Sequence, residues 1–113
     1  MAKVNYGRHL PAFILLFLAQ EPAYGLTLLK QLEQRLPHNN ADSAAVYRAL
    51  QELEKSEAVE SYWDTSDPGP AKKWYKISPQ GFRILDDFKK DIEQRKSNIE
   101  FFLSEYAKLF SKE

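Results

Sequence analysis

The stretch that decides the fold runs from Asp42 to Ser78 and reads DSAAVYRALQELEKSEAVESYWDTSDPGPAKKWYKIS. Its first part predicts a helix, because the apolar residues fall within one narrow arc at about 100° per residue. The members of this stripe are Val46, Ala49, Leu50 and Leu53. A helix with one apolar stripe turns that stripe toward the rest of its domain, so we expect these side chains in the core.

The opposite face of this helix opens with small residues and one cation. Ala44, Arg48 and Gln51 lie there, with Tyr47 on the flank, and acidic residues come only later. An arginine can pair with guanine in a major groove, and small residues can approach thymine methyl groups. The face therefore fits a helix whose first two turns enter a major groove of DNA. An ordinary amphipathic helix with a solvated face is the alternative.

The remainder of the stretch predicts a β-hairpin. Apolar and polar residues alternate over Val59–Thr65 and again over Lys72–Ser78, as in strands. Between them, Ser66–Pro70 is dense in turn-forming residues. A two-stranded hairpin is marginal on its own, so we expect its aromatic residues to pack on the helices. Lys72 and Lys73 then lie just past its tip.

Two helices are predicted before this stretch. The first runs from Pro11 to about Gln20, and the second from Leu26 to about Leu36, with a turn over Pro37–Asn40. Either Asp42 or Ser43 can cap the third helix by accepting a backbone N–H bond. Two short helices joined by a polar turn, the second with a sparse outer face, predict a helix-turn-helix arrangement.

The run most like a membrane or export signal is AFILLFLA, Ala12–Ala19, which follows a polar arm over Met1–His9. It is shorter than the roughly 20 apolar residues that span a bilayer. A signal peptide has a similar pattern, but Gln20–Pro22 is a poor cleavage context. We therefore expect a helix buried between other helices, and no membrane partner.

The last predicted helix begins at Ser78–Gly81, with Ser78 as its cap and Pro79 in its first turn. Its apolar residues keep a seven-residue repeat, which marks a helix that packs on another helix. One register holds Leu85, Ile92, Ile99 and Tyr106, and the other holds Phe88, Phe102 and Leu109, with Arg95 as its one polar member. About 30 helical residues span about 45 Å. This length exceeds the domain before it, so we expect a second copy of the chain to cover the seam.

Composition and charge narrow the class of protein. A length of 113 residues, 43% of them hydrophobic and 13% aromatic, indicates one globular domain with a modest core. Cysteine is absent, which excludes disulfides and thiolate metal sites and fits a reducing cytoplasm. The 16 basic and 16 acidic residues cancel, whereas nucleic-acid binders often carry a basic excess. A basic surface for binding DNA would then require basic residues to cluster locally.

No catalytic or metal site is indicated. His9 and His38 lie in a polar arm and a turn, without a nearby cysteine or paired carboxylates at ligand spacing. A Gly-rich phosphate loop and a nucleophile motif are also missing from the sequence. We therefore expect no enzyme, no metal and no cofactor, with His38 as a solvated turn residue.

Polar residues on both sides of the third helix are candidate DNA contacts. Lys72 and Lys73 could meet phosphates or enter a minor groove, although ordinary surface lysines on a strand are the alternative. Asn39, Asn40 and Ser43 precede or begin the helix, where its N-terminus favours anions. Simple turn and cap chemistry is the alternative for these three, and both roles can hold together.

Several short motifs together resemble the PadR family of transcriptional regulators. They are Tyr24-Gly25, Val46–Leu50 with Leu53-Glu54, Ser61–Trp63, and Lys73–Ser78 followed by Gly81. The similarity covers Leu10 to Phe88. A single C-terminal helix in place of a larger C-terminal domain resembles the small PadR subfamily.

The resemblance implies a mainly α fold with a β-hairpin. It implies a winged helix-turn-helix DNA-binding domain over residues 1–78 and a C-terminal dimerisation helix over 79–113, in one compact unit. It also implies a homodimeric repressor that binds a pseudo-palindromic operator in double-stranded DNA and is released by a small hydrophobic or aromatic effector. A winged-helix module that binds a protein partner, without direct DNA binding, is the alternative.

The residues and the resemblance together predict three sets of site residues. The DNA-binding set is Tyr24, Asn39, Asn40, Ser43, Ala44, Ala45, Tyr47, Arg48, Lys72 and Lys73. The dimer-interface set is Phe13, Phe17, Leu85, Phe88, Ile92, Ile99, Phe102, Tyr106 and Leu109. An apolar effector pocket could be lined by Phe13, Phe17, Phe88 and Ile92. Core packing explains this last set equally well.

The chain also departs from the family pattern. Ala44 stands where the family often has glycine, and Glu57-Ala58 replaces a frequent Gly-Leu before the strand. The tip of the hairpin lacks the usual run of several basic residues. Ile92 stands where some small members present a tryptophan that stacks on flat drugs.

Overall fold

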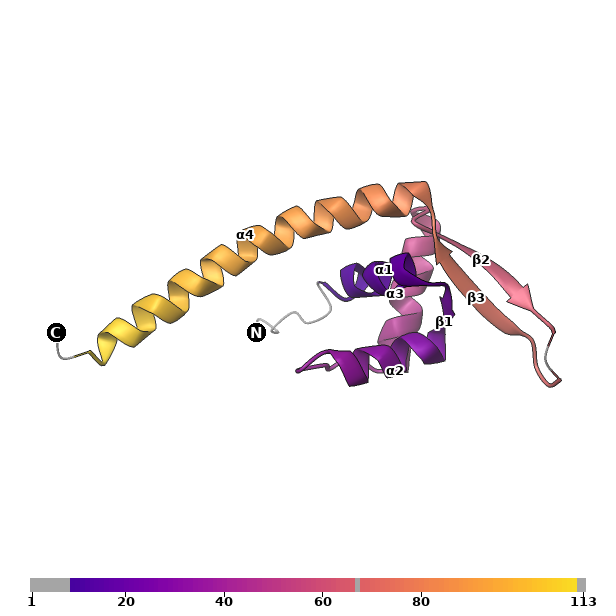
Figure 1. Ribbon diagram of the computed structural model, residues 1–113, viewed down its shortest axis with the longest axis horizontal. Coiled ribbons are helices and arrows are strands. Elements are labelled where there is room, and N and C mark those ends of the chain that lie inside the picture. The colour runs from indigo at the N-terminus through magenta and orange to yellow at the C-terminus, as the bar shows by residue number, and fades with distance from the viewer. Residues whose placement is uncertain (1–8, 67, 112–113) are drawn as a thin grey trace.

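The computed structural model describes residues 9–66 and 68–111, and it folds them into the predicted order of elements (Figure 1). The elements are α1 (Leu10–Gln20), β1 (Ala23–Tyr24), α2 (Gly25–Arg35), α3 (Ser43–Lys55), β2 (Val59–Asp64), β3 (Lys72–Ile77) and α4 (Pro79–Leu109). The prediction of a mainly helical winged helix-turn-helix with a long last helix is therefore confirmed.

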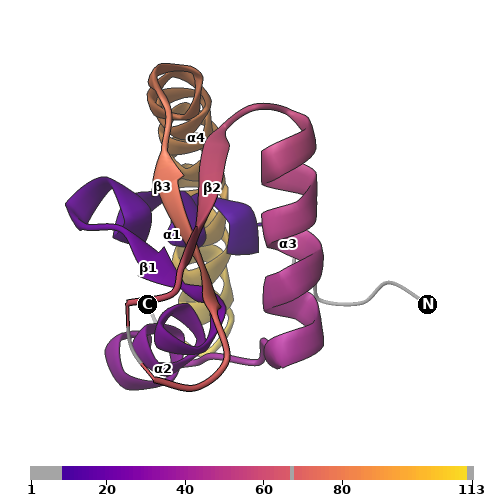
Figure 2. The ribbon, with the colours of Figure 1, turned by 90° about the vertical axis from the view of Figure 1, so that its right-hand side faces the viewer.

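The strands form one antiparallel sheet in the order β1-β3-β2. The sequence did not predict β1, whose two residues pair as Ala23 with Tyr75 and Tyr24 with Trp74. This third strand supports a hairpin that would be marginal alone. Figure 2 shows the hairpin with α3 on one side and β1 on the other.

The core lies where α1, α2 and α3 meet the base of the sheet. Its largest fully buried side chains are Ile14, Leu15, Leu28, Leu32, Leu50 and Val46. The run AFILLFLA belongs to α1, and most of it is buried as predicted, although Leu16 is exposed. Within residues 9–66 and 68–111, no helix combines the length and the apolar character that crossing a membrane requires.

α3 has a defined start and a defined end. At its start, the Asp42 carboxylate accepts a hydrogen bond from the Ala45 N–H at 2.9 Å, so Asp42 is the cap. At its end, Glu57 adopts a φ of 62°, and the Ala58 N–H donates back to the Leu53 carbonyl at 2.8 Å. This left-handed helix end is a conformation that glycine adopts at least cost, and here a glutamate carries it.

A tight joint fixes α4 to the end of α3. Ser78 caps α4, because its Oγ accepts the Gly81 N–H at 3.0 Å and donates to the Glu57 carbonyl at 2.6 Å. The Ser78 N–H also donates to the Ala58 carbonyl at 3.0 Å. A Cβ at Gly81 would overlap that same carbonyl oxygen, so the joint requires glycine at this position.

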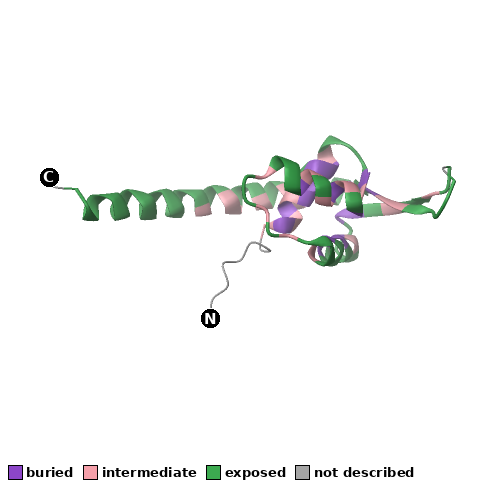
Figure 3. Cartoon of the chain, turned by 90° about the horizontal axis from the view of Figure 1, so that it is seen from below, coloured by how far each residue is buried: buried purple, intermediate pink, exposed green. Residues whose placement is uncertain are grey.

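α4 has a covered half and an uncovered half. In the covered half, Ile84, Leu85 and Phe88 pack against the core beside α1. From residue 96 to 111 every residue is exposed, and this half projects away from the rest of the chain (Figure 3). The chain as a whole measures 66 × 28 × 27 Å.

His9 departs from the predicted free arm. It precedes α1 as the N-cap residue, and its Nε2 lies 3.0 Å from the Asp91 Oδ2 of α4. Periodicity could not reveal this contact, because it joins residues 82 positions apart. The rest of the predicted arm, residues 1–8, lies outside the described residues.

Candidate nucleic-acid interface

The outer face of α3 is exposed in the phase that the sequence predicts. Its apolar stripe, Val46, Ala49, Leu50 and Leu53, is buried. Ala44, Tyr47 and Arg48 are exposed on the other side, and Ala45 is half-buried between the two. A small, cationic and aromatic surface therefore faces outward over the first two turns.

The Tyr47 ring is held in place by Gly25, the first residue of α2. A Cβ at Gly25 would come within 2.6 Å of the Tyr47 Cε1 and 2.8 Å of its hydroxyl oxygen. The absent side chain therefore makes room for the ring, which stays 48% exposed. Gly25 belongs to the Tyr24-Gly25 motif, but no pattern in the sequence assigns it this role.

The predicted polar contacts at the start of α3 differ in whether their side chains are already hydrogen-bonded within the chain. The Asn39 side chain closes a turn, accepting the Ala41 N–H at 3.1 Å and donating to the Ala41 carbonyl at 3.4 Å. Turn chemistry therefore uses part of its hydrogen-bonding capacity. Asn40 and Ser43 are exposed and remain candidate phosphate donors.

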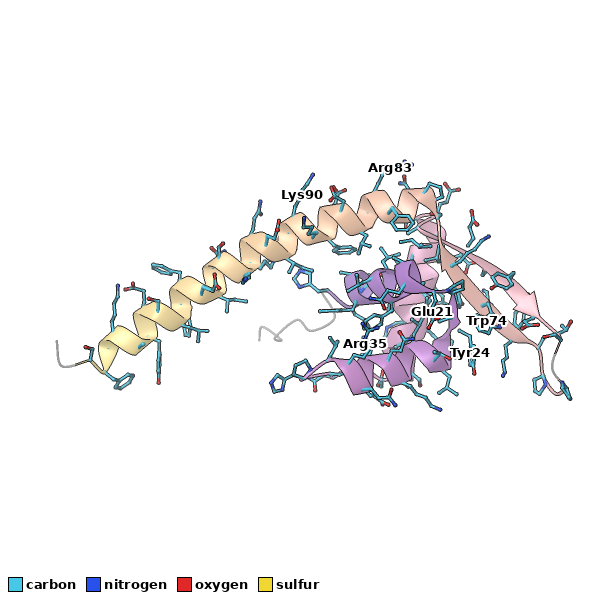
Figure 4. The ribbon with its side chains drawn as sticks, in the orientation of Figure 1. Glu21, Tyr24, Arg35, Trp74, Arg83 and Lys90 are labelled. Carbon is cyan, nitrogen blue, oxygen red and sulfur yellow. The ribbon has the colours of Figure 1, made fainter. Side chains whose placement is uncertain are left out.

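The hairpin forms the wing and has two different faces. On its outer face an aromatic row crosses all three strands: Trp74 meets Tyr24 edge-on at 5.1 Å and stacks with Tyr62 at 6.5 Å between ring centroids. Figure 4 shows Tyr24 and Trp74 together beside the wing. On the inner face, Tyr75 is buried against the helices. The aromatic row on one face and the core contact on the other hold the wing.

The two wing lysines are not equivalent. Lys72 is exposed, with its Nζ 5.0 Å from the centroid of the Tyr24 ring. Lys73 is half-buried, and its Nζ lies 3.3 Å from the Glu54 carboxylate. Desolvation lowers the pKa of Lys73, but Tyr75 and Glu54 outweigh it and hold the pKa above its ordinary value. Lys72 is therefore the freer cation of the pair.

Glu54 connects α3 to both strands of the hairpin. Its carboxylate accepts the Ser61 hydroxyl of β2 at 2.6 Å and the Lys73 ammonium of β3 at 3.3 Å. The hydrogen bond from Ser61 lowers the pKa of Glu54, burial opposes this effect, and Lys73 lowers the pKa further. The ionised Glu54 carboxylate is thus the form that these hydrogen bonds stabilise. The sequence did not assign Glu54 any role.

A cleft of about 460 Å³ lies between the wing and the helices. It is lined by Tyr24, Gly25, Leu26, Tyr47, Trp63, Ala71, Lys72, Lys73 and Tyr75. The structure thus brings together Tyr24, Tyr47 and both lysines from the predicted DNA-binding set. The other lining residues, Gly25, Leu26, Trp63, Ala71 and Tyr75, are not in that set.

Residues 14–87 match the transcriptional regulator PadR-like family. The chain belongs to the PadR-like family. This confirms the resemblance over Leu10–Phe88, and with it a role in DNA-binding transcription regulation rather than in catalysis.

The chain is also similar to individual proteins. The chain is 27% identical to an uncharacterised protein of Lysinibacillus sphaericus over 96 residues, which are 84% of this chain and 88% of the other. A PadR-like transcriptional regulator from Bacillus cereus is 25% identical with a TM-score of 0.72, covering 85% of this chain and 92% of its own. A transcriptional regulator from Clostridium thermocellum shares the fold at 21% identity, with a TM-score of 0.79 and coverage of 90% and 98%.

This PadR-like chain has a second surface, an apolar groove of about 440 Å³ between α1 and α4. It is lined by Ala12, Phe13, Leu16, Phe82, Leu85, Asp86, Phe88, Lys89, Ile92 and Glu93. The groove contains Phe13, Phe88 and Ile92 from the predicted effector pocket.

Phe17 does not line this groove, and the alternative of core packing holds for this residue. Its side chain is only 3% exposed, and the Arg35 guanidinium lies 4.5 Å from the centroid of its ring. α1 is apolar nearly all round, so its sequence pattern could not separate the core side from the groove side. Leu16, which is exposed, takes the position in the groove that Phe17 was expected to fill.

The uncovered half of α4 presents the rest of the predicted seam to solvent. Its exposed large apolar residues include Ile99, Phe102, Tyr106 and Leu109, joined by Leu103 and Phe110. Tyr106 contacts Phe102 and Phe110, with ring centroids 6.2 and 5.2 Å apart. An exposed apolar surface of this extent indicates an interaction site.

Proposed function

We propose that this PadR-like regulator is a cytoplasmic homodimer that binds a pseudo-palindromic operator in double-stranded DNA and represses transcription. The observation that carries the proposal is the exposed face of α3 beside the wing. Arg48 and Tyr47 point outward there, and Lys72 lies across the cleft on β3. A helix for the major groove and a cation for the flanking backbone are thus on one side of the domain.

The two cations suit different parts of a duplex. Arg48 stands in the second turn of α3, where a guanidinium can bond both acceptors of a guanine edge. Lys72 stands at the start of β3, where an ammonium can neutralise a phosphate or reach into the neighbouring minor groove. Arg48 would then supply sequence preference, and Lys72 would supply affinity that depends on salt.

The seam of α4 supports a second copy of the chain as the partner. An aromatic side chain buries about 150–250 Å², and burial of apolar surface contributes about 25 cal/mol per Å². Leaving Phe102 and Tyr106 in water forfeits this contribution. A symmetric dimer covers the same patch on both copies. It would also present two reading helices, about 34 Å apart if they enter successive major grooves.

The groove between α1 and α4 supports a small hydrophobic or aromatic effector. Its volume of about 440 Å³ lies within the range of roughly 300–1,000 Å³ that is usual for ligand sites. Because the groove lies beside α4, an occupant can bind two arrangements of the dimer unequally. Only such unequal binding shifts the dimer away from the arrangement that fits the operator. Ile92 offers an apolar wall for this ligand rather than a stacking ring.

Footprinting on the DNA upstream of the chain's own gene tests the proposal. We expect two protected half-sites about one helical turn apart, with an affinity that falls linearly as the logarithm of salt concentration rises. The rival is a winged-helix module that binds only a protein partner. Its support is the zero net charge of the chain and the pairing of Lys73 with Glu54. Binding that shows neither sequence preference nor salt dependence would favour the rival.

A further inference from the structure

Trp63 is an exposed aromatic residue for which the fold gives no packing role. Its side chain is 64% exposed, more than Tyr47 or Tyr62. An indole is among the largest apolar side chains and gains most when it is removed from water. Trp74, the other tryptophan, is half-buried in the aromatic row of the sheet. Among the described wing residues, Trp63 therefore keeps the most exposed aromatic side chain.

The position of Trp63 on β2 directs it toward the reading helix. Successive strand residues point to opposite faces, so Trp63 shares its face with Val59 and Ser61. Val59 is buried in the core, and Ser61 bonds to Glu54 of α3. Trp63 lies farther out on this inner face, opposite Lys73 in the register. It therefore extends beyond the core while still facing α3.

The surroundings of Trp63 combine aromatic surface with positive charge. It lines the cleft of about 460 Å³ together with Tyr47 of α3 and Lys72 of β3. None of the lining residues that the structure describes is acidic. Apolar rings beside an ammonium match a sugar-phosphate backbone, which alternates apolar deoxyribose with anionic phosphate. The cleft is also continuous with the α3 face that is proposed to enter the major groove.

We propose that Trp63 is a DNA-contacting residue of the wing. Its indole lies against a deoxyribose of the strand that passes between the wing and α3, while Lys72, on the other face of the hairpin at the start of β3, pairs with a neighbouring phosphate. This inference rests on the proposed DNA-binding function and adds a contact that carries no charge. Tyr47, held by Gly25, forms the opposite wall of the same passage.

Affinity measurements separate this uncharged contact from a charged one. Trp63→Ala should weaken binding to operator and to random duplex alike, by about fivefold to tenfold, because a contact with deoxyribose removes part of the apolar indole surface from water. The slope of affinity against salt should stay unchanged, because no phosphate partner is lost. Lys72→Ala should lower that slope. Tyr62→Ala removes an exposed ring from the opposite face of the same strand and should weaken binding less than Trp63→Ala.

Fluorine NMR tests the contact in the unaltered chain. Wild-type protein labelled with 5-fluorotryptophan should give two resonances, which Trp63→Phe assigns. On titration with operator duplex, the Trp63 resonance should move more than the Trp74 resonance. If fluorescence anisotropy shows the duplex bound while the Trp63 resonance stays in place, the inference is wrong and the proposed function stands. If wild type binds no duplex at low salt, both are wrong.

Discussion

Substitution of Arg48 distinguishes recognition of a base from binding of a phosphate. It is exposed on α3, and a guanidinium that pairs with guanine contributes about 1–3 kcal/mol of discrimination. We therefore expect Arg48→Ala to lose about that much operator affinity and much less affinity for random DNA, measured by anisotropy at fixed salt. Arg83→Ala removes the same charge from the exposed second turn of α4 (Figure 4) and serves as the control. Equal losses on both DNAs would make Arg48 a phosphate contact.

Glu57 adopts a backbone conformation that is unfavourable for its amino-acid type. Its φ of 62° is disfavoured for any residue with a Cβ. Glu57→Gly should raise the free energy of unfolding by about 0.5–1 kcal/mol, because glycine adopts this helix end without that penalty. The control is Glu52→Gly inside α3, which should lower the free energy of unfolding by about 1 kcal/mol. Urea unfolding measures both, and a destabilised Glu57→Gly would contradict the strain argument.

At the scale of elements, the Glu54 carboxylate holds the reading helix to the wing. Its pKa lies below the ordinary value of 4.5, so its contribution to stability is present above that pH and is lost as the pH falls through the lowered value. Urea unfolding of Glu54→Gln should therefore show a deficit against wild type at pH 7 that shrinks toward pH 3.5. Glu60→Gln, in a more exposed pair with Lys76, should change little at pH 7. A deficit independent of pH would mean that the charge is unimportant.

At the scale of the whole molecule, the proposed dimer depends on the seam of α4. Phe102→Asp places a charge in the apolar seam and should give a monomer by light scattering at micromolar concentration. Phe101 is equally exposed, 67% against 63%, but lies about 200° around the helix from Ile99, outside the seam. Phe101→Asp should therefore remain a dimer. A monomeric wild type would contradict the dimer proposal itself.

Much of the fold could be predicted because it depends on local periodicity and caps. α1 begins one residue before the predicted start at Pro11, and the wing strands begin as predicted. β1 could not be found, because two residues show no period. That Phe17 is buried and Leu16 is exposed could not be predicted either. A helix that is apolar all round has no polar face from which to tell the buried side.

The site could be predicted only in part, because it depends on contacts between distant residues. The exposed face of α3 follows from the helical period, so the exposure of Tyr47 and Arg48 could be predicted. The bond between Glu54 and Lys73 joins residues 19 positions apart, and the fit of Tyr47 over Gly25 depends on how α2 meets α3. Neither leaves a local pattern. The sequence places Trp63 near the tip of the hairpin, but only the folded structure shows that its side chain is exposed.

The joint at Gly81 makes α4 a lever arm. Ser78, Ala58 and Gly81 fix its near end to the reading helix, and its 31 residues extend about 45 Å from there. A tilt of about 5° over that length moves the far end by about 4 Å, close to the rise of one base pair, about 3.4 Å. An angular change too small to disturb the core would thus shift the register of two half-sites by a whole step of the duplex.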